Sequence, residues 1–450
     1  MTSSDPRRAV ALPPPVVHVR RSVLDNGVRV LSDRVPDCPS VTIGVWVGVG
    51  GRDEAPELAG SSHFLEHLLF KGTERRTAAG IAMELDEVGG EMNAYTASEH
   101  TAYYARVPAG ELDVALEVLL DVVAAPALRP DEFEAEREVI LEELAAAADD
   151  PEDVVAVRLF EALFPGHSLG REVLGSEASI GGLTRDDVAG FFSQWYRPHN
   201  LVVTVAGDVD HDLLAERVAT VLDVGASGSA PIRRAPGPAT DEVVVAHDPG
   251  ELVHLAYGWR TPGTEHPDRF ALAVLNHVLG ATPSSRLFQR VREERGLTYS
   301  ISSGLSQYSD AGALTVACAT GPSKAATVME IIDAELSALA ADGVTEAELA
   351  RSQRSIRGSL LLGLETSGAR SMRLGRAETL RGRVVALDEH LAGIEAVRAA
   401  DVARVAHEVL GSARVTSLVG PGDLDSLVAR AERPPRLSRR RCRPVPPRHV

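Results

Sequence analysis

The sequence repeats one order of helices and strands on either side of a segment that has no periodicity of its own. This segment, from Val224 to Asp241, is rich in Gly, Ser, Ala and Pro, which is typical of linkers. Before it, a helical pattern ends at Gly90 and a strand with Tyr95 follows; after it, a helical pattern ends at Gly296 and a strand with Tyr299 follows. At 450 residues the chain is also too long for one ordinary core. We therefore expect two similar α+β domains that arose by duplication.

The spacing of apolar residues predicts individual elements in both halves. In the first half we expect strands over residues 28–32, 41–49, 91–97, 101–107 and 201–206, and helices over 59–71, 78–88, 111–125, 131–148, 186–194 and 212–222. In the second half we expect strands over 252–259, 298–303 and 312–319, and helices over 268–279, 285–295, 324–341 and 345–362.

The net charge of −18 restricts the class of ligand. The last residues, Arg433 to Val450, contain seven Arg, so the rest of the chain carries about −25 (−18 minus 7). An acidic body argues against nucleic acid as the main ligand. The basic tail is expected to be disordered and solvated, with docking to a partner or a membrane surface as the alternative.

Cysteine content and hydropathy indicate the compartment. Cys38, Cys318 and Cys442 are far apart and form no CxxC pair, which argues against a disulfide framework and favours a reducing environment. No window of 18 apolar residues exists, so no membrane span is expected. The apolar piece Ala9–Leu12 is too short for the core of a signal peptide. The expected location is the cytoplasm.

Two histidines one helical turn apart form the first candidate site. In His63-Phe-Leu-Glu66-His67, a turn of about 100° per residue places the two imidazoles about 40° apart, with Glu66 about 60° to the other side of His63. Paired imidazoles suit tetrahedral zinc, and a carboxylate beside them can accept a proton from the attacking water. Taken alone, such a pair is more often solvated or part of a core. The intervening Glu66 favours a metal site.

A catalytic zinc needs a third protein ligand and keeps one position open. The helix expected over residues 131–148 is acidic and supplies the candidates Glu136, Glu138, Glu142 and Glu143. Glu136 and Glu143 are two turns apart and share a face, on which Val139 and Ile140 provide apolar surface. An acidic run of this kind, taken alone, is most often a solvated helix face.

The motif His63-x-x-Glu66-His67 is the inverted zinc motif of the inverzincins. The sequence resembles the pitrilysin family, and within it the half-length bacterial relatives of the β subunit of the mitochondrial processing peptidase. By this resemblance, the third zinc ligand is Glu143, which lies 76 residues after His67, and Glu136 supports the site. Glu66 is then the catalytic base.

Two further elements resemble the same family. Gly89-Gly90-x-x-Asn93-Ala94-Tyr95-Thr96 is similar to its edge strand, and the resemblance implies that Asn93 and Ala94 contact the backbone of a substrate added as a strand. Arg292 and Tyr299 are similar to its Arg-x6-Tyr element, which reaches toward the substrate carbonyl. Without the resemblance, Arg292 would be taken for a surface partner of Glu293 and Tyr299 for a core residue of a strand.

The resemblance implies a fold and an activity. Each domain is expected to be a mostly antiparallel sheet packed with helices, and a flexible linker joins the two. We expect a disordered tail (1–18), a catalytic zinc domain (19–223), the linker (224–245), a homologous inactive domain with the Arg/Tyr element (246–430) and the disordered basic tail (431–450). The implied protein is a metalloendopeptidase with one Zn²⁺ per chain that hydrolyses unfolded peptides or small polypeptides in a closed chamber.

The same resemblance implies pairing, because full-length members hold four domains and this chain holds two. An intact site favours a homodimer, and a heterodimer with a related chain is the alternative. A non-catalytic subunit that closes the chamber of a partner is the rival function. Mitochondrial presequence cleavage is not implied, because the segment from Gly280 to Ser285 lacks the long glycine-rich loop of the processing peptidase's non-catalytic partner.

Overall fold

The computed structural model describes residues 18–222, 224–225 and 228–432. The tails expected to be disordered lie outside the described residues, except for residue 18 at one end and residues 431–432 at the other. Within the described residues, no helix is both long and apolar enough to cross a bilayer.

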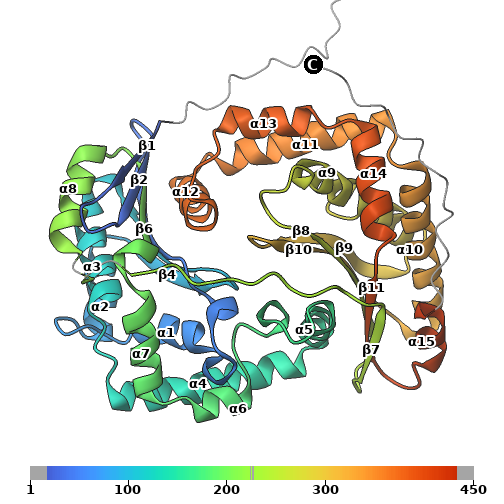
Figure 1. The fold of residues 1–450 in the computed structure, drawn as a ribbon, viewed down its shortest axis with the longest axis horizontal. Helices are drawn as coiled ribbons and strands as arrows, with labels where there is room; N and C mark the ends of the chain where they lie inside the picture. Colours follow the sequence, from blue (N-terminus) through green and yellow to red (C-terminus); the bar gives the residue numbers. More distant parts are fainter. Residues whose placement is uncertain (1–17, 223, 226–227, 433–450) are drawn as a thin grey trace, which may run out of the picture.

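Each half is built around one β-sheet (Figure 1). The first sheet contains β1 (Val19–Val23), β2 (Arg29–Arg34), β3 (Ser40–Val47), β4 (Glu91–Thr96), β5 (Thr101–Pro108) and β6 (Leu201–Gly207). The second contains β7 (Glu242–His247), β8 (Val253–Pro262), β9 (Thr298–Gln307), β10 (Ala311–Thr320) and β11 (Arg414–Gly420).

The two sheets follow the same strand plan. Their orders are β1-β2-β6-β3-β5-β4 and β7-β11-β8-β10-β9. In the first, β2 and β6 are parallel, in the second, β7 and β11 are parallel, and all other neighbours are antiparallel. In the order in which they lie across each sheet, five strands correspond one to one, as a duplication predicts: β2, β6, β3, β5 and β4 match β7, β11, β8, β10 and β9. In both halves a tyrosine-bearing strand, β4 or β9, lies at the sheet edge.

Helices cover the sheets and bury most of their apolar surface. In the first half these are α1 (Ser61–Leu69), α2 (Ala78–Glu87), α3 (Leu112–Ala124), α4 (Pro130–Asp149), α5 (Pro151–Leu163), α6 (Glu177–Gly182), α7 (Arg185–Trp195) and α8 (His211–Val221). In the second half they are α9 (Arg269–Leu279), α10 (Pro322–Asp342), α11 (Glu346–Gly363), α12 (Ser367–Arg381), α13 (Leu387–Glu395), α14 (Ala399–Leu410) and α15 (Asp425–Ala431).

Most elements expected from apolar spacing have a counterpart, with ends that differ by a few residues. The helix expected over 285–295 is shorter, covering 286–293, and its Phe288–Glu293 part is a π-helical turn. The apolar spacing did not predict β1, β7, β11, α5, α6 or α12 to α15.

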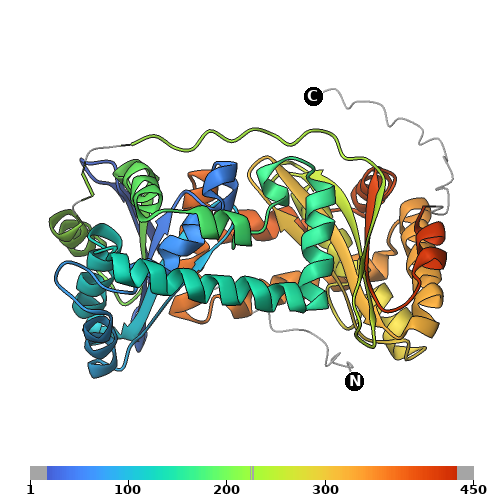
Figure 2. The same cartoon turned by 90° about the horizontal axis from the view of Figure 1, so that it is seen from below.

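The two halves exchange one helix each. Helix α5 belongs to the first half, yet it packs on β8 and β11 of the second sheet (Figures 1 and 2). Its Val155, Leu159 and Leu163 form a core cluster with Val415 and Val419 of β11. Helix α12 makes the reverse exchange and packs on β3 and β6 of the first sheet. Each sheet is therefore completed on its second face by the other half of the chain.

The contact between α12 and the first sheet combines an apolar cluster around Leu374 and Trp46 with buried polar pairs. Ser367 bonds to Thr42 at 3.0 Å and Ser371 to Thr204 at 2.8 Å, both buried. Between these hydroxyl pairs and the end of the helix, Gly375 lies so close to the Trp46 ring that a Cβ there would be 1.8 Å from a ring carbon. Glycine is therefore required for this approach of helix and sheet.

The segment between the sheets is anchored at several points, which include hydrogen bonds from Asn200 to the carbonyl of Ser229 and from Arg260 to that of Gly237. Arg233 places its guanidinium 2.7 Å from the Asp53 carboxylate of the first half. Beside it, buried Arg52 contacts buried Glu99 at 2.6 Å and Asp310 of the second half at 2.7 Å. This anchoring limits the flexibility that the linker composition predicts. Strand β7 begins at Glu242, inside the segment expected as linker.

Candidate metal centre

The first helix of the site begins at a buried carboxylate. Glu54 accepts the backbone N–H of Gly60 and that of Ser62, both at 2.7 Å, at the start of α1. A helix start leaves its first N–H groups without intrahelical partners and favours negative charge, so Glu54 satisfies both needs. Gly60 has φ 93°, a left-handed conformation that favours glycine. These two residues fix where α1 begins and therefore where its histidines lie.

Apolar packing brings the second helix of the site to the first. Phe64 of α1 stacks on Phe133 of α4 with ring centroids 4.5 Å apart, and both are buried. Leu65, Leu68 and Leu69 are also buried, as expected from the motif, while Phe70 is only partly so. On α4, Ile140 is buried, but Val139, which we expected on the same face, is 40% exposed.

This packing brings His63, His67 and Glu143 to a common point. One ligand atom from each lies within 4.8 Å of the other two. A Glu143 carboxylate oxygen is 3.7 Å from His63 Nε2 and 3.6 Å from His67 Nε2. Bonds of about 2.0–2.1 Å in tetrahedral zinc separate donor atoms by about 3.3 Å, so this donor set fits zinc in chemistry and nearly in spacing. The Glu143 side chain is 43% exposed, which leaves the site open on one side.

The surroundings favour the protonation states that a metal requires. Burial, with a smaller effect from His67, lowers the pKa of His63 to about 4, so His63 is neutral at pH 7 and its nitrogen lone pair is available. Glu136 lies 3.0 Å from Nδ1 of His67 and 2.6 Å from Lys71 Nζ. A carboxylate on Nδ1 leaves Nε2 of His67 as the ligand atom and orients the ring. Glu136 therefore lies where it can orient the ring of His67.

Glu66 lies on the same helix beside this cluster. Thr96 of β4 donates a 2.6 Å hydrogen bond to its carboxylate. Burial raises the pKa of Glu66, and the nearby Glu143 acts in the same direction, while Thr96 and His67 oppose them. A carboxyl with a raised pKa that still ionises suits a group that must accept and return a proton.

The predicted substrate residues lie at two places. Asn93 and Ala94 are on β4, three and two residues before Thr96 respectively, and Asn93 is exposed. Arg292 lies over the ring of Tyr299, 5.1 Å from its centroid, and within 3.8 Å of Glu293. Tyr299 is 86% exposed and so is no core residue. Within the described chain, no recorded contact joins Arg292 or Tyr299 to the metal cluster.

Sequence reasoning missed three residues that hold the site. Glu54, Lys71 and Thr96 contact the helix start, the supporting carboxylate and the candidate base, respectively. Only Thr96 lies inside a sequence motif, that of the edge strand, and alternation along the strand places it on the face opposite Tyr95. Nothing in the local sequence distinguishes Glu54 from a surface glutamate.

Replacing Glu54 with Ala is expected to lower the free energy of unfolding by about 2 kcal/mol, because two N–H groups lose their buried acceptor. Zinc affinity should fall with it, since the start of α1 is no longer fixed. Urea denaturation and competition with a fluorescent zinc chelator measure the two effects. Glu57→Ala, at an exposed glutamate three residues later, is the control, and equal stability of the two variants would contradict the role of Glu54.

Two histidines and a glutamate on facing helices, beside a sheet edge in a duplicated α+β fold, define a metallopeptidase type of protein. Comparisons with known proteins agree. Residues 29–177 match the family described as insulinase (peptidase family M16), and residues 182–356 match the peptidase M16 inactive domain. The chain belongs to the M16, or pitrilysin, family of peptidases, which confirms the family predicted from its motifs.

Relatives that match this chain over nearly their whole length, and a solved structure, support the same assignment. The chain is 43% identical to an uncharacterized zinc protease of Mycobacterium tuberculosis, over 92% of this chain and 96% of the relative. It is 36% identical to the uncharacterized zinc protease YmxG of Bacillus subtilis, over 90% and 98%. A protease from Helicobacter pylori has the same fold, with a TM-score of 0.85 and 25% identity over 90% of this chain and 100% of that structure. The predicted α+β two-domain fold is thereby confirmed.

Proposed function

We propose that this chain is a zinc-dependent endopeptidase that hydrolyses unfolded peptides or small polypeptides in a closed chamber. One observation carries the proposal: His63, His67 and Glu143 present their ligand atoms within 4.8 Å of one another, with Glu66 beside them. The names of the relatives as zinc proteases support zinc as the metal. The single ligand cluster among the described residues supports one ion per chain. When bound, zinc would polarise the scissile carbonyl and acidify a water molecule.

The residues around the metal position have distinct roles in this proposal. Glu66 accepts a proton from the attacking water and later returns it to the leaving amine. Thr96 holds the Glu66 carboxylate with its 2.6 Å hydrogen bond. Glu136 holds the ring of His67, and Lys71 in turn neutralises Glu136. The hydrogen bond from Thr96 therefore restricts rotation of the Glu66 carboxylate between the two proton transfers.

The edge of the first sheet orients the substrate. β4 is the last strand of its sheet, so its outer edge has no strand partner among the described residues. A peptide that adds to this edge as a further strand would lie along Asn93 and Ala94 and pass close to Glu66, because Thr96 joins the strand to that residue. Strand addition uses the peptide backbone, which suits a peptidase that accepts varied unfolded sequences.

Arg292 and Tyr299 fit a role in a pair of chains. They form one cluster, with Tyr299 widely exposed, and within the described chain they make no recorded contact with the metal residues. We propose that in a homodimer this cluster faces the substrate carbonyl across the chamber and donates to the developing oxyanion. A heterodimer with a related chain is the alternative. Sizing of the purified protein, with zinc counted per chain, separates the two.

A mixed peptide library tests the activity itself. We expect cleavage at internal bonds, read out by mass spectrometry, and a loss of at least about a hundredfold in rate when zinc is removed by a chelator. One equivalent of zinc per chain should restore the rate. Cleavage that persists without metal would refute the zinc mechanism. A protein that binds zinc but cleaves no peptide would favour the non-catalytic, chamber-closing subunit instead.

A further inference from the structure

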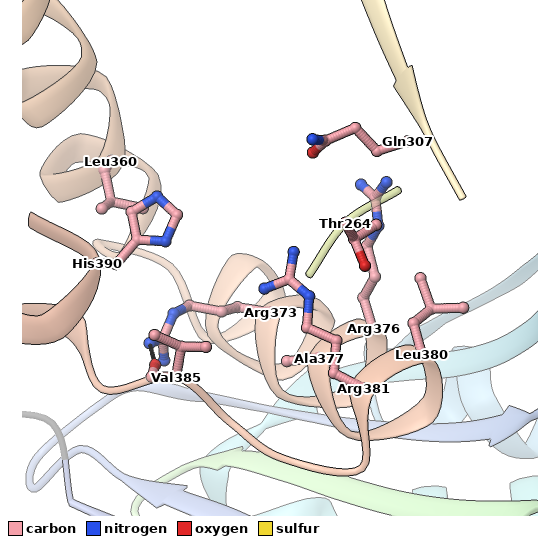
Figure 3. A pocket seen from close by; sticks show the side chains of 10 residues that line it. All are labelled: Thr264, Gln307, Leu360, Arg373, Arg376, Ala377, Leu380, Arg381, Val385 and His390. Carbon is pink, nitrogen blue, oxygen red and sulfur yellow. Dashed lines mark hydrogen bonds between the residues drawn. The ribbon is translucent and has the colours of Figure 1, made fainter. Parts of the chain in front are cut away.

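A second site lies on α12, on the face of the first sheet opposite the metal centre. Here α12 meets α13 and the end of β9 around a cavity of about 240 Å³ (Figure 3). Its polar lining consists of Thr264, Gln307, Arg373, Arg376, Arg381 and His390, and no acidic residue of the described chain lines it. Figure 3 shows the guanidinium groups of Arg376 and Arg381 directed into the space below Gln307.

This cavity is cationic in a chain whose net charge is −18. Three arginines line it, and Arg383 lies beside them. At the rim, Arg381 and Arg383 share Glu265, each at 3.2 Å, and Arg383 also lies 3.4 Å from Glu389. Asp33 is close enough to Arg373 to affect its pKa, so Arg376 is the lining arginine that has no carboxylate partner among the described residues.

The donors inside the cavity are not used by the protein. Within the described part of the chain, Arg376 has no recorded hydrogen bond or ion pair. Arg381 faces Glu265 through Nε, and its two terminal nitrogens have no recorded hydrogen bond among the described residues. Burial lowers the pKa of Arg381, Glu265 opposes this shift, and neighbouring arginines, Arg376 among them, lower it further. A bound anion would relieve this repulsion.

The cavity lies close to the strand along which we propose that substrate binds. Arg376 is near enough to Tyr95 of β4 for its charge to affect the pKa of that phenol. Side chains alternate along a strand, so Thr96 faces α1 and the metal residues while Tyr95 faces α12. A peptide added to β4 therefore directs every second side chain toward the α12 side of the sheet.

We propose that this cavity binds a carboxylate of the peptide substrate, supplied by an acidic side chain or by the C-terminus. Guanidinium groups bind carboxylates through paired charge-assisted hydrogen bonds, and Arg376 and Arg381 offer such donors side by side. The inference rests on the proposed peptidase function and adds a specificity to it. A protein that is acidic overall would thus select peptides that carry negative charge at one position.

Three matched peptides test the inference on the full-length protein. One has an internal Glu and an amidated C-terminus, one has Gln there and a free C-terminus, and one has Gln and an amide. We expect kcat/KM for one of the first two to exceed that for the third by about tenfold, which also identifies the source of the carboxylate. In the Arg376→Gln variant this ratio should fall to about one. Arg354→Gln, at an exposed arginine on α11, should keep it.

The outcomes are distinct from failure of the proposed function. Equal kcat/KM for all three peptides, or a ratio that Arg376→Gln leaves unchanged, overturns the inference while peptidase activity stands. If no peptide is cleaved, the proposed function is wrong. Fluorescence anisotropy of the same peptides, labelled, then measures whether the cavity binds a carboxylate. Selective binding that Arg376→Gln removes supports the site, and equal binding of all three overturns it. Arg376 has no recorded partner in the described chain, so its replacement should not impair folding.

Discussion

Replacing Glu66 with Gln is expected to lower kcat for peptide hydrolysis about a thousandfold while zinc stays bound. Glutamine keeps the size of the side chain and can still bond to Thr96, but it cannot accept a proton from water. The three residues that fit the metal are unchanged, so zinc content should remain one per chain. Initial rates on a fluorogenic peptide and zinc by mass spectrometry measure the two quantities on the same sample.

The matched control for this substitution is Glu138→Gln. Glu138 is exposed on α4, two residues from Glu136, and it makes no recorded hydrogen bond or ion pair among the described residues. Its variant should keep the wild-type rate. A Glu66→Gln protein that retains zinc and cleaves at the wild-type rate would show that another group acts as base. Loss of zinc together with activity would instead mean that Glu66 supports the metal residues.

The metal cluster could be predicted because its parts carry local signals. His63, Glu66 and His67 lie within two turns of one helix, where spacing alone fixes their relative directions. Glu143 was one of several acidic candidates until the family resemblance selected it. The structure shows why only that face works: Phe64 stacks on Phe133, and this contact sets which side of α4 meets α1. Such a long-range contact leaves no periodic signal in the sequence.

The exchange of helices could not be predicted, for a physical reason that differs between the two. Helix α5 has an apolar face, but a pattern of apolar residues does not say which sheet the face will cover. Helix α12 has little apolar signal on its buried face. Leu374 is its only large apolar residue that is fully buried, while Ser367, Arg370, Ser371 and Glu378 are buried with hydroxyl and ionic partners. Hydrophobic periodicity reveals a helix face only where apolar side chains are removed from water. It misses a buried face whose polar groups are hydrogen-bonded or ion-paired.

The packing of α12 on the first sheet couples the two halves, and Gly375→Ala should weaken this coupling. The added Cβ would lie 1.8 Å from a Trp46 ring carbon, so α12 must move away from the first sheet. We expect the free energy of unfolding to fall by about 3 kcal/mol. Hydrogen exchange should rise in β3 and β6, although the substitution lies in the second half of the chain. Urea denaturation and exchange measured by mass spectrometry test both effects.

Gly368→Ala on the same helix provides the comparison, because its Cβ would be 4.0 Å from its nearest neighbour, Thr42. Gly368 lies in the first turn of α12, so without a clash alanine there should be at least as stable as glycine. The two variants make the same chemical change on one helix, and only Gly375→Ala should lower the free energy of unfolding. If both behave alike, the close approach of α12 to Trp46 does not hold the halves together. If Gly375→Ala affects only the second sheet, the exchange of helices does not couple the domains.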